Sequence, residues 1–163
     1  MAGKNYKVTY FNITALGEPL RFILSYAGKD FEDVRVEKPD WPAIKPTTPF
    51  GKVPVVEVDG KVLHQTKPIM RWIAKSIGLA GDNDWEDLQI SIAADTVDDI
   101  RTPLAGFFYE AHEGAKEQKK EPVLNQVLPF ALERLDAQVK ANNGYLANGK
   151  VSNPDIVSTS QML

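Results

Sequence analysis

Cysteine is absent from the 163 residues of the chain. Its absence excludes a disulfide scaffold, a thiolate metal site and a nucleophilic or redox cysteine. Histidine is scarce as well, since only His64 and His112 are present and they lie far apart in the sequence. Because a histidine-based metal site needs several ligands close together, we expect no metal.

The chain also lacks a strong excess of charge and any long apolar run. Its formal net charge is −3 at pH 7, which gives no sign of a nucleic-acid-binding surface. No apolar run approaches the ~18 residues that a membrane span needs, and the start MAGKNYKV contains no apolar signal-peptide core. We therefore expect a cytoplasmic protein with neither nucleic acid nor membrane as a partner.

What the chain does contain is typical of a folded globular protein, with 43% hydrophobic and 25% charged residues. Residues 7–11 alternate as a short strand, and the helix that follows begins at Glu18-Pro19 and ends at Gly28. Residues 32–36 form a second strand, parallel to the first across a right-handed connection. The start of the chain therefore predicts a βαβ unit.

The next stretch combines a rigid loop with a hairpin. Five prolines between positions 39 and 54 predict an irregular loop. Apolar runs at 53–58 and 61–64 flank Asp59-Gly60, which is the strongest short-range signal for a β-hairpin. A helix then begins at Thr66 and ends at Gly78. The first half is thus predicted to be an α/β domain, βαβ followed by ββα, over residues 4–80.

The second half is predicted to be all-α, over residues 83–163. One amphipathic helix covers residues 85 to about 110, and a second begins at Pro122 and ends before Asn142. The polar residues 112–121 between them are interpreted as a solvated connection. Ser152 and Asp155 have the spacing of a capping box, but the residues after them are few and rich in β-branched and hydroxylated types. We expect no stable helix there.

Several residues of the first half could bind a ligand, and each has a plainer alternative. Tyr10, at the end of the first strand, could donate a hydrogen bond to a developing anion or to a thiolate, or it could only pack at the edge of the core. A cis peptide bond between Val53 and Pro54 would leave the backbone groups of Val53 outside the strand ladder, open to a peptide-like ligand. Alternatively, Pro54 only trims an edge strand.

Further candidates lie around the hairpin and on the long helix. Thr66 could place a ligand carboxylate at the N-terminus of its helix, or it could serve only as an N-cap. Trp41, Lys45 and Lys52 offer an indole donor and two cations, or else a surface anchor with solvated lysines. Asp99, next to another aspartate, could balance an ammonium group or belong to an ordinary acidic face.

Nine stretches between residues 6 and 150 match one family: YKVTYFN (6–12), ALGEPLR (15–21), FEDVR (31–35), DWPAIK (40–45), PFGKVPV (49–55), EVDG (57–60), WEDLQI (85–90), DTVDD (95–99) and GYLANGK (144–150). On these stretches the sequence resembles the glutathione transferases, specifically the sigma class and its insect members. The resemblance implies a thioredoxin-like N-terminal domain that holds glutathione, followed by a helical C-terminal domain that supplies the pocket for the electrophile. After residue 152 the sequence departs from the family pattern, so we expect a truncated second domain that lacks its last helices.

The resemblance also implies the residues of the site. Tyr10 matches the tyrosine that hydrogen-bonds the sulfur of glutathione and favours its thiolate, which matters because a thiol of pKa ~8.5 is mostly protonated at neutral pH. Val53 would offer its backbone groups to the cysteinyl unit, ahead of a cis Pro54. Asp99 would reach the γ-glutamyl end of glutathione in the neighbouring subunit of a homodimer. The implied glutathione-binding residues are Tyr10, Trp41, Lys45, Gly51, Lys52, Val53, Pro54, Gln65, Thr66 and Asp99.

Four of these matches, and one further position, carry more detail. Trp41 and Lys45 match the pair near the glycyl carboxylate, and Gln65 matches a residue on the γ-glutamyl end. Thr66 stands where the family usually has serine, and because the hydroxyl remains we expect carboxylate binding to survive. Leu16 stands where vertebrate prostaglandin-isomerising members carry arginine, which argues against that isomerase activity, although insect members share the leucine.

The function implied by the resemblance is the conjugation of reduced glutathione to small hydrophobic electrophiles in detoxification, with peroxidase or isomerase side activity. No metal and no covalent enzyme intermediate are implied, and the reactive sulfur would belong to glutathione, the co-substrate. Two alternatives stay open. One is a catalytically impaired glutathione-binding or crystallin-like structural protein that has lost its C-terminal helices, and the other is a fragment that does not fold stably.

Overall fold

The computed structural model describes residues 5–161, which fall into two compact units. The first unit comprises the residues up to Ala80 together with those from Ile156 onward, and the second comprises Gly81–Asp155. The residues from Ile156 onward, which the prediction assigned to the helical domain, thus group with the first unit by their contacts. The predicted bounds of 4–80 and 83–163 stay a prediction.

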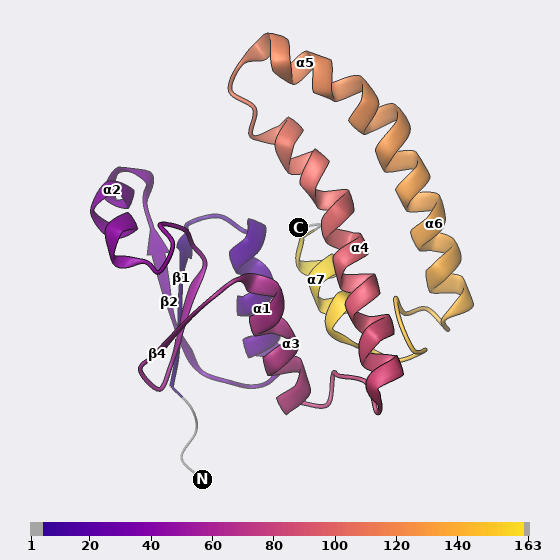
Figure 1. Cartoon of the computed structure of the whole chain (residues 1–163), viewed down its shortest axis with the longest axis horizontal. Helices are drawn as coiled ribbons and strands as arrows, with labels where there is room; N and C mark the ends of the chain where they lie inside the picture. Colours follow the sequence, from indigo (N-terminus) through magenta and orange to yellow (C-terminus); the bar gives the residue numbers. More distant parts are fainter. Residues whose placement is uncertain (1–4, 162–163) are drawn as a thin grey trace. The chain divides into compact units, whose positions relative to one another are not determined.

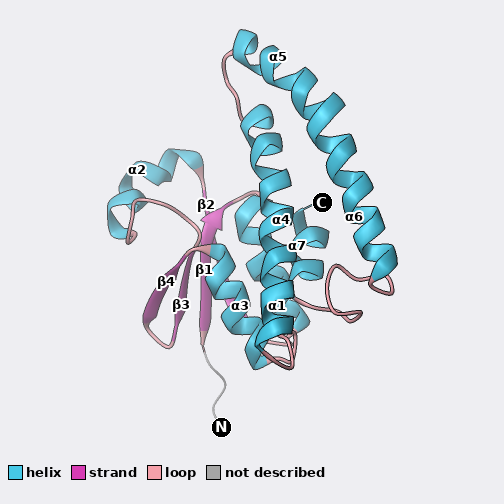
Figure 2. Ribbon diagram, turned by 45° about the vertical axis from the view of Figure 1, so that its right-hand side comes forward, coloured by secondary structure: helices cyan, strands magenta, loops and turns pink. Residues whose placement is uncertain are grey.

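The first unit is built on a four-stranded sheet with the order β2-β1-β3-β4 (Figure 2). Its strands are β1 (Tyr6–Phe11), β2 (Phe31–Val36), β3 (Val55–Val58) and β4 (Lys61–His64). The first two strands are parallel, while β3 runs antiparallel to both β1 and β4. Asp59 and Gly60 turn the β3–β4 hairpin with φ values of 50° and 77°, the left-handed geometry that an Asp-Gly turn favours. The predicted βαβ–ββα order is confirmed.

Two helices cover one face of this sheet. They are α1 (Glu18–Tyr26) and α3 (Thr66–Ser76), which lie side by side in Figures 1 and 2. The core between sheet and helices is made of fully buried aliphatic side chains, among them Val8, Val56, Leu24 and Ile73. Burial of this apolar surface fixes which end of β1 meets the beginnings of both helices, and so it positions the candidate site.

The proline-rich segment is more regular than predicted. The short helix α2 (Trp41–Ile44) lies on the side of the sheet away from α1 and α3 (Figure 1), between the 3-10 turns Lys38–Asp40 and Lys45–Thr47. Each turn carries a proline in its first two positions, where the missing N–H costs no intrahelical hydrogen bond. The irregular loop predicted for residues 39–54 is therefore wrong over its first half.

The second unit consists of helices. The long helix α4 (Asp84–Phe108) runs beside a continuous helical segment made of α5 (Glu113–Pro122), a π-helical segment (Val123–Val127) and α6 (Leu128–Ala141), as Figures 1 and 2 show. The solvated connection predicted for residues 112–121 is wrong, because these residues form α5. Their polarity reflects an exposed helix whose N-terminus is capped by His112, with Nδ1 accepting from the amide of Ala115 at 3.3 Å.

The tail also forms a helix, α7 (Asn153–Gln161), so the expectation of no stable helix there is wrong. The capping pair works as its spacing suggests: the backbone N–H and the hydroxyl of Ser152 both donate to Asp155 Oδ2, at 2.8 and 2.9 Å. The amide of Leu146 donates to the other oxygen of Asp155 at 2.9 Å. Ile156 and Val157 are buried, and this tertiary burial supplies what local propensity does not.

Candidate functional site

Tyr10 is the centre of the predicted site. It lies near the end of β1 and is only 6% exposed, with its ring against the backbone of Gly17. The amide of Leu16 donates a hydrogen bond to the phenolic oxygen at 3.3 Å. A phenol that accepts a hydrogen bond becomes a stronger donor, because neighbouring hydrogen bonds polarise one another. The structure therefore holds Tyr10 as a positioned, polarised donor.

Thr66 is brought to the same place from α3. Its hydroxyl donates to the carbonyl oxygen of Leu16 at 3.1 Å, so Leu16 contacts both Thr66 and Tyr10. The alternative that Thr66 serves as the N-cap is wrong, because Gln65 occupies that position and no side-chain hydrogen bond caps it. Thr66 is the first residue of the helix, where backbone N–H groups attract an anion.

Gln65 has an unusual backbone. Its φ of 75° and ψ of 110° lie in a region that side-chain-bearing residues rarely adopt, at a typical cost of about 1–3 kcal/mol. Such strain persists where the surrounding structure enforces it, and it is common at ligand sites. A single sequence contains no signal for this strain, so the prediction for Gln65 rested on the resemblance alone.

Trp41, Lys45 and Gly51 lie on the α2 side of the site. The ring of Trp41 meets that of Phe11, the neighbour of Tyr10, edge to face with centroids 5.2 Å apart. The side chain of Lys45 passes over Gly51, so close that a Cβ at position 51 would lie 3.2 Å from Lys45 Cε. Gly51 also has a φ of 60°, which favours glycine. The structure therefore brings Lys45 and Gly51 together and holds Trp41 beside the end of β1.

The predicted cis peptide bond between Val53 and Pro54 is present. The paired residues of β3 begin at Val55, so Val53 has no partner in the strand registers. Lys52 is exposed. The contacts of these positions with a peptide-like ligand stay a prediction.

Arg21 is a residue that the sequence reasoning missed. It projects from α1, is only 5% exposed, and forms ion pairs of 2.9 Å with both Glu18 and Asp33. Its guanidinium also donates to the carbonyl oxygens of Phe11 and Ile13, at 3.4 and 3.0 Å, and lies 6.0 Å from the centroid of the Tyr10 ring. Arg21 thus ties the loop after β1 to α1 and β2. Nothing in a single sequence distinguishes it from a surface arginine.

We expect Asp33 to make stability depend on acid pH. Burial alone would raise the pKa of Asp33, but hydrogen bonds and attraction from Arg21 and Arg35 outweigh it and lower the pKa below its ordinary value. Its contribution is therefore complete above the unfolded-state pKa of about 3.9 and is lost as the pH falls through the lower folded-state pKa. Urea unfolding between about pH 7 and about pH 2 should show this loss in the wild type.

The Asp33→Asn variant should lack that part of the acid dependence and should lose about 1.5–3 kcal/mol at neutral pH, as expected for a hydrogen bond to a charged group. Glu57→Gln is the control, because the Lys7–Glu57 pair is longer at 3.5 Å and more exposed, and it should change stability little. A wild-type acid profile identical to that of Asp33→Asn would contradict the assignment.

Gly17 is a second residue that the sequence reasoning missed. A Cβ built on it would lie 2.4 Å from Cδ1 of Tyr10, although its φ of −82° and ψ of −30° suit any residue. We expect Gly17→Ala to displace the Tyr10 ring or the loop, costing about 1–3 kcal/mol of stability. Activity that depends on Tyr10 should fall about 10- to 100-fold, since small displacements of reacting groups cost about that much.

Thermal unfolding and initial rates would measure these effects. The control is Gly106→Ala, because position 106 lies within α4 with no atom near the added Cβ. That variant should gain about 0.5–1 kcal/mol from helix propensity. A Gly17→Ala protein as stable as Gly106→Ala would show that the close approach to Tyr10 is unimportant.

Asp99 lies on α4, in the second unit, and its predicted role at the site stays a prediction. Within its own unit it lines a largely apolar groove of about 560 Å³ between α4 and α6. Apolar side chains including Ile100, Phe130 and Leu135 line the groove, with Arg134 among the polar ones. Phe130 is 61% exposed, so the apolar lining of the groove is open to solvent in this unit.

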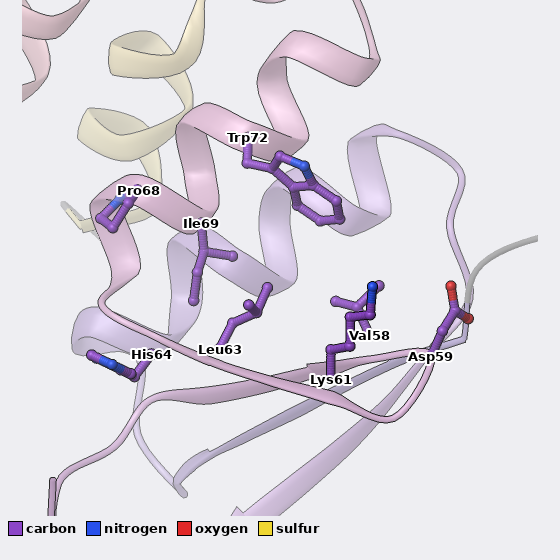
Figure 3. Close-up of a pocket in the computed structure, with 8 residues that line it drawn as sticks. All are labelled: Val58, Asp59, Lys61, Leu63, His64, Pro68, Ile69 and Trp72. Atoms are coloured by element: carbon purple, nitrogen blue, oxygen red, sulfur yellow. The ribbon is translucent and has the colours of Figure 1, made fainter. Parts of the chain in front are cut away.

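A separate pocket of about 430 Å³ lies between β4 and α3, where Leu63 faces Ile69 and Trp72 (Figure 3). None of the ten predicted site residues lines it. Among residues 5–161 no group of three histidine or acidic side chains is placed to hold a metal ion. In the same range, no helix combines the length and the apolar character needed to cross a membrane.

Comparison with known proteins identifies two matching family models. Residues 6–75 match the glutathione S-transferase N-terminal domain, and residues 98–162 match the glutathione S-transferase C-terminal domain. A glutathione S-transferase of Anopheles gambiae is 49% identical over 152 residues, covering 93% of this chain and 75% of the relative. Glutathione S-transferase S1 of Drosophila melanogaster is 47% identical, covering 93% of this chain and 61% of the relative.

A solved structure has the same fold. The structure of prostaglandin synthase D of Nilaparvata lugens superposes with a TM-score of 0.94 at 47% sequence identity, covering 97% of this chain and 79% of that one. At this identity the likeness is one of sequence as well as of fold.

Proposed function

Because the chain belongs to the glutathione S-transferase family, we propose that it conjugates reduced glutathione to small hydrophobic electrophiles. The observation that carries the proposal is the polarised phenol of Tyr10, which accepts from Leu16 and lies beside the start of α3. A phenol in this position donates to the sulfur and favours the thiolate, the nucleophilic form of a thiol. The sulfur then attacks an electrophilic carbon or a peroxide oxygen, with no metal and no covalent enzyme intermediate.

The remaining site residues are proposed to hold glutathione along the same surface. Trp41 and Lys45 would bind its glycyl carboxylate, supported by the ring contact of Trp41 with Phe11. Val53 would pair its backbone groups with the cysteinyl unit, in the manner of an added strand. The strained Gln65 would contact the γ-glutamyl end, whose carboxylate would meet Thr66 and the start of α3. Gly51, Lys52 and Pro54 would complete the surface.

We place the chain in the sigma class, supported by the resemblance at residues 6–12, 15–21 and 95–99, and we propose a cytoplasmic role in detoxification. The similar structure from Nilaparvata lugens is named a prostaglandin synthase D, which makes prostaglandin isomerisation a second candidate activity. Leu16, in place of the arginine of vertebrate isomerases, argues against it. Assaying conjugation and isomerisation on the same preparation would separate the two activities.

The test of the main proposal is retention on immobilised glutathione together with conjugation of a generic aromatic halide. We expect both, and S-methylglutathione, which binds without a free thiol, should inhibit the conjugation. Retention without conjugation would instead support the alternative of a glutathione-binding or crystallin-like protein. A broad melt at low temperature with strong binding of a hydrophobic dye would indicate the unstable fragment.

We propose that a second copy of the chain covers the groove between α4 and α6, forming a homodimer in which Asp99 reaches the neighbouring site. The exposed apolar lining of the groove, with Phe130 at 61% exposure, supports an interface. Phe130→Glu should weaken the dimer by about 30-fold or more, the effect of losing a buried aromatic anchor worth about 2 kcal/mol. Light scattering over a concentration series would measure it.

Asp136→Ala is the matched control for this variant, because Asp136 lies on the same helix, does not line the groove, and pairs with Lys140. It should leave the dimer intact. Asp99→Asn should leave the dimer intact as well but weaken glutathione binding. A wild-type monomer at all concentrations would contradict the proposal.

A further inference from the structure

Leu16 connects two site residues that come from different elements. The hydroxyl of Thr66, on α3, donates to the carbonyl oxygen of Leu16 at 3.1 Å. The amide of Leu16 donates in turn to the phenolic oxygen of Tyr10, on β1, at 3.3 Å. The path from Thr66 to Tyr10 therefore consists of two hydrogen bonds through the backbone of one residue.

The backbone around Leu16 needs this support. The preceding residue, Ala15, has a φ of 39°, and the 3-10 turn Ala15–Gly17 begins without a side-chain cap at Thr14. The side chain of Leu16 is only partly buried, so packing alone does not hold its peptide groups. Since a hydrogen bond weakens steeply with misalignment, a small rotation of this turn would remove the Leu16 amide from the phenol.

We infer that Thr66 is a positioning residue for Tyr10: its hydroxyl holds the Leu16 backbone so that the Leu16 amide stays on the phenolic oxygen and strengthens the phenol as a donor. The inference rests on the proposed function where it concerns the thiol, because a stronger donor lowers the pKa of the bound glutathione thiol. This role differs from contact with a ligand carboxylate, which changes the affinity for glutathione and leaves the acidity of its thiol alone.

The experiment compares the wild type with Thr66→Val, which keeps the shape of the side chain and removes its hydroxyl proton, and with Thr66→Ser, which keeps a hydroxyl. Ser76→Ala is the matched control, since Ser76 Oγ donates to the carbonyl of Ile73 at the other end of the same helix. The thiol ligands are glutathione and 4-aminobutyryl-cysteinyl-glycine, an analogue without the γ-glutamyl carboxylate. The ultraviolet absorbance of the bound thiolate as a function of pH gives the thiol pKa for each pair.

A second readout needs no ligand. Hydrogen exchange of the Leu16 amide reports directly on its hydrogen bond to Tyr10. In Thr66→Val we expect this exchange to become about tenfold faster, the factor that corresponds to one weakened hydrogen bond. We also expect the thiol pKa to rise by about one unit with both thiol ligands. Thr66→Ser and Ser76→Ala should resemble the wild type in both measurements, and thermal unfolding would confirm that every variant is folded.

The outcomes separate the two roles of Thr66. If Thr66→Val weakens the binding of glutathione but leaves both the Leu16 exchange and the thiol pKa of the analogue unchanged, Thr66 only contacts the carboxylate and the inference is overturned. If the wild type binds neither ligand, the proposed function fails instead. The Leu16 exchange in Thr66→Val then still decides whether Thr66 positions the turn.

Discussion

Replacing Arg21 by methionine should lower the free energy of unfolding by about 3–5 kcal/mol, the usual cost of removing one partner from a buried ion pair. Arg21 is 5% exposed and pairs with both Glu18 and Asp33 at 2.9 Å. Methionine fills much of the same space, but it leaves Glu18 without this cation and leaves Asp33 with only the exposed Arg35. It also leaves the carbonyl oxygens of Phe11 and Ile13 without that donor. A loss of this size is a large share of the 5–15 kcal/mol typical of a domain.

Arg35→Met provides a matched control, because Arg35 pairs with the same carboxylate of Asp33 at 2.8 Å but its side chain is 44% exposed. An exposed pair contributes about 0–1 kcal/mol, so this variant should unfold nearly as the wild type does in urea. Arg21→Lys should fall between the two, since an ammonium keeps the charge but cannot reach two carboxylates and two carbonyls at once. Equal losses for Arg21→Met and Arg35→Met would show that burial does not distinguish the two arginines.

A double variant tests whether the cost comes from the unpaired charge. Asp33→Leu combined with Arg21→Met removes Arg21 and one of its two carboxylates, replaces both with apolar groups, and leaves Glu18 as the remaining carboxylate. Such replacements are often far less costly than breaking the pair, so the double variant should be more stable than Arg21→Met alone. Additive losses would instead assign the cost to lost packing around α1.

Local sequence signals were sufficient to predict most of the helices and strands of the first unit. The Asp59-Gly60 turn and the Glu18-Pro19 helix start are chemical instructions within a few residues, and the structure has the elements where they predict them. The predictions for residues 112–121 and for the tail were wrong for different reasons. The helix after His112 is capped by a histidine, a local contact that the residue type does not indicate. The tail helix has the local cap that its spacing indicates, but it also depends on burial of residues such as Ile156, which is a tertiary fact.

The residues of the candidate site likewise divide into those that the sequence could identify and those that it could not. Side chains with distinctive chemistry, such as Tyr10 and Trp41, could be named from the sequence because the residue type itself indicates a role. Leu16 and Gly17 act through a backbone amide and through the absence of a Cβ, and neither property is visible in a leucine or a glycine met in a sequence. Their roles required knowing which part of the chain lies against the phenol of Tyr10.

Replacing Tyr10 by phenylalanine should reduce the turnover of conjugation about 10²–10³-fold, the usual loss when one positioned donor to a developing anion is removed. The ring would keep its packing against Gly17 and Phe11, so affinity for glutathione should remain nearly unchanged. The amide of Leu16 loses its acceptor, which should cost only about 1 kcal/mol of stability. A low turnover with intact binding is therefore the signature of a lost donor.

The pH dependence sharpens this test. Without the phenol, the bound thiol should titrate close to its ordinary pKa of about 8.5. The loss of turnover in Tyr10→Phe relative to the wild type should therefore be largest near neutral pH and should shrink above about pH 9. Initial rates with a generic aromatic halide, measured across that range, would show it. Tyr26→Phe is the control, since Tyr26 is 55% exposed at the end of α1 and should leave the rates unchanged. Unchanged turnover in Tyr10→Phe would count against the mechanism, while a deficit that is constant with pH would mean that Tyr10 orients the thiol without making it more acidic.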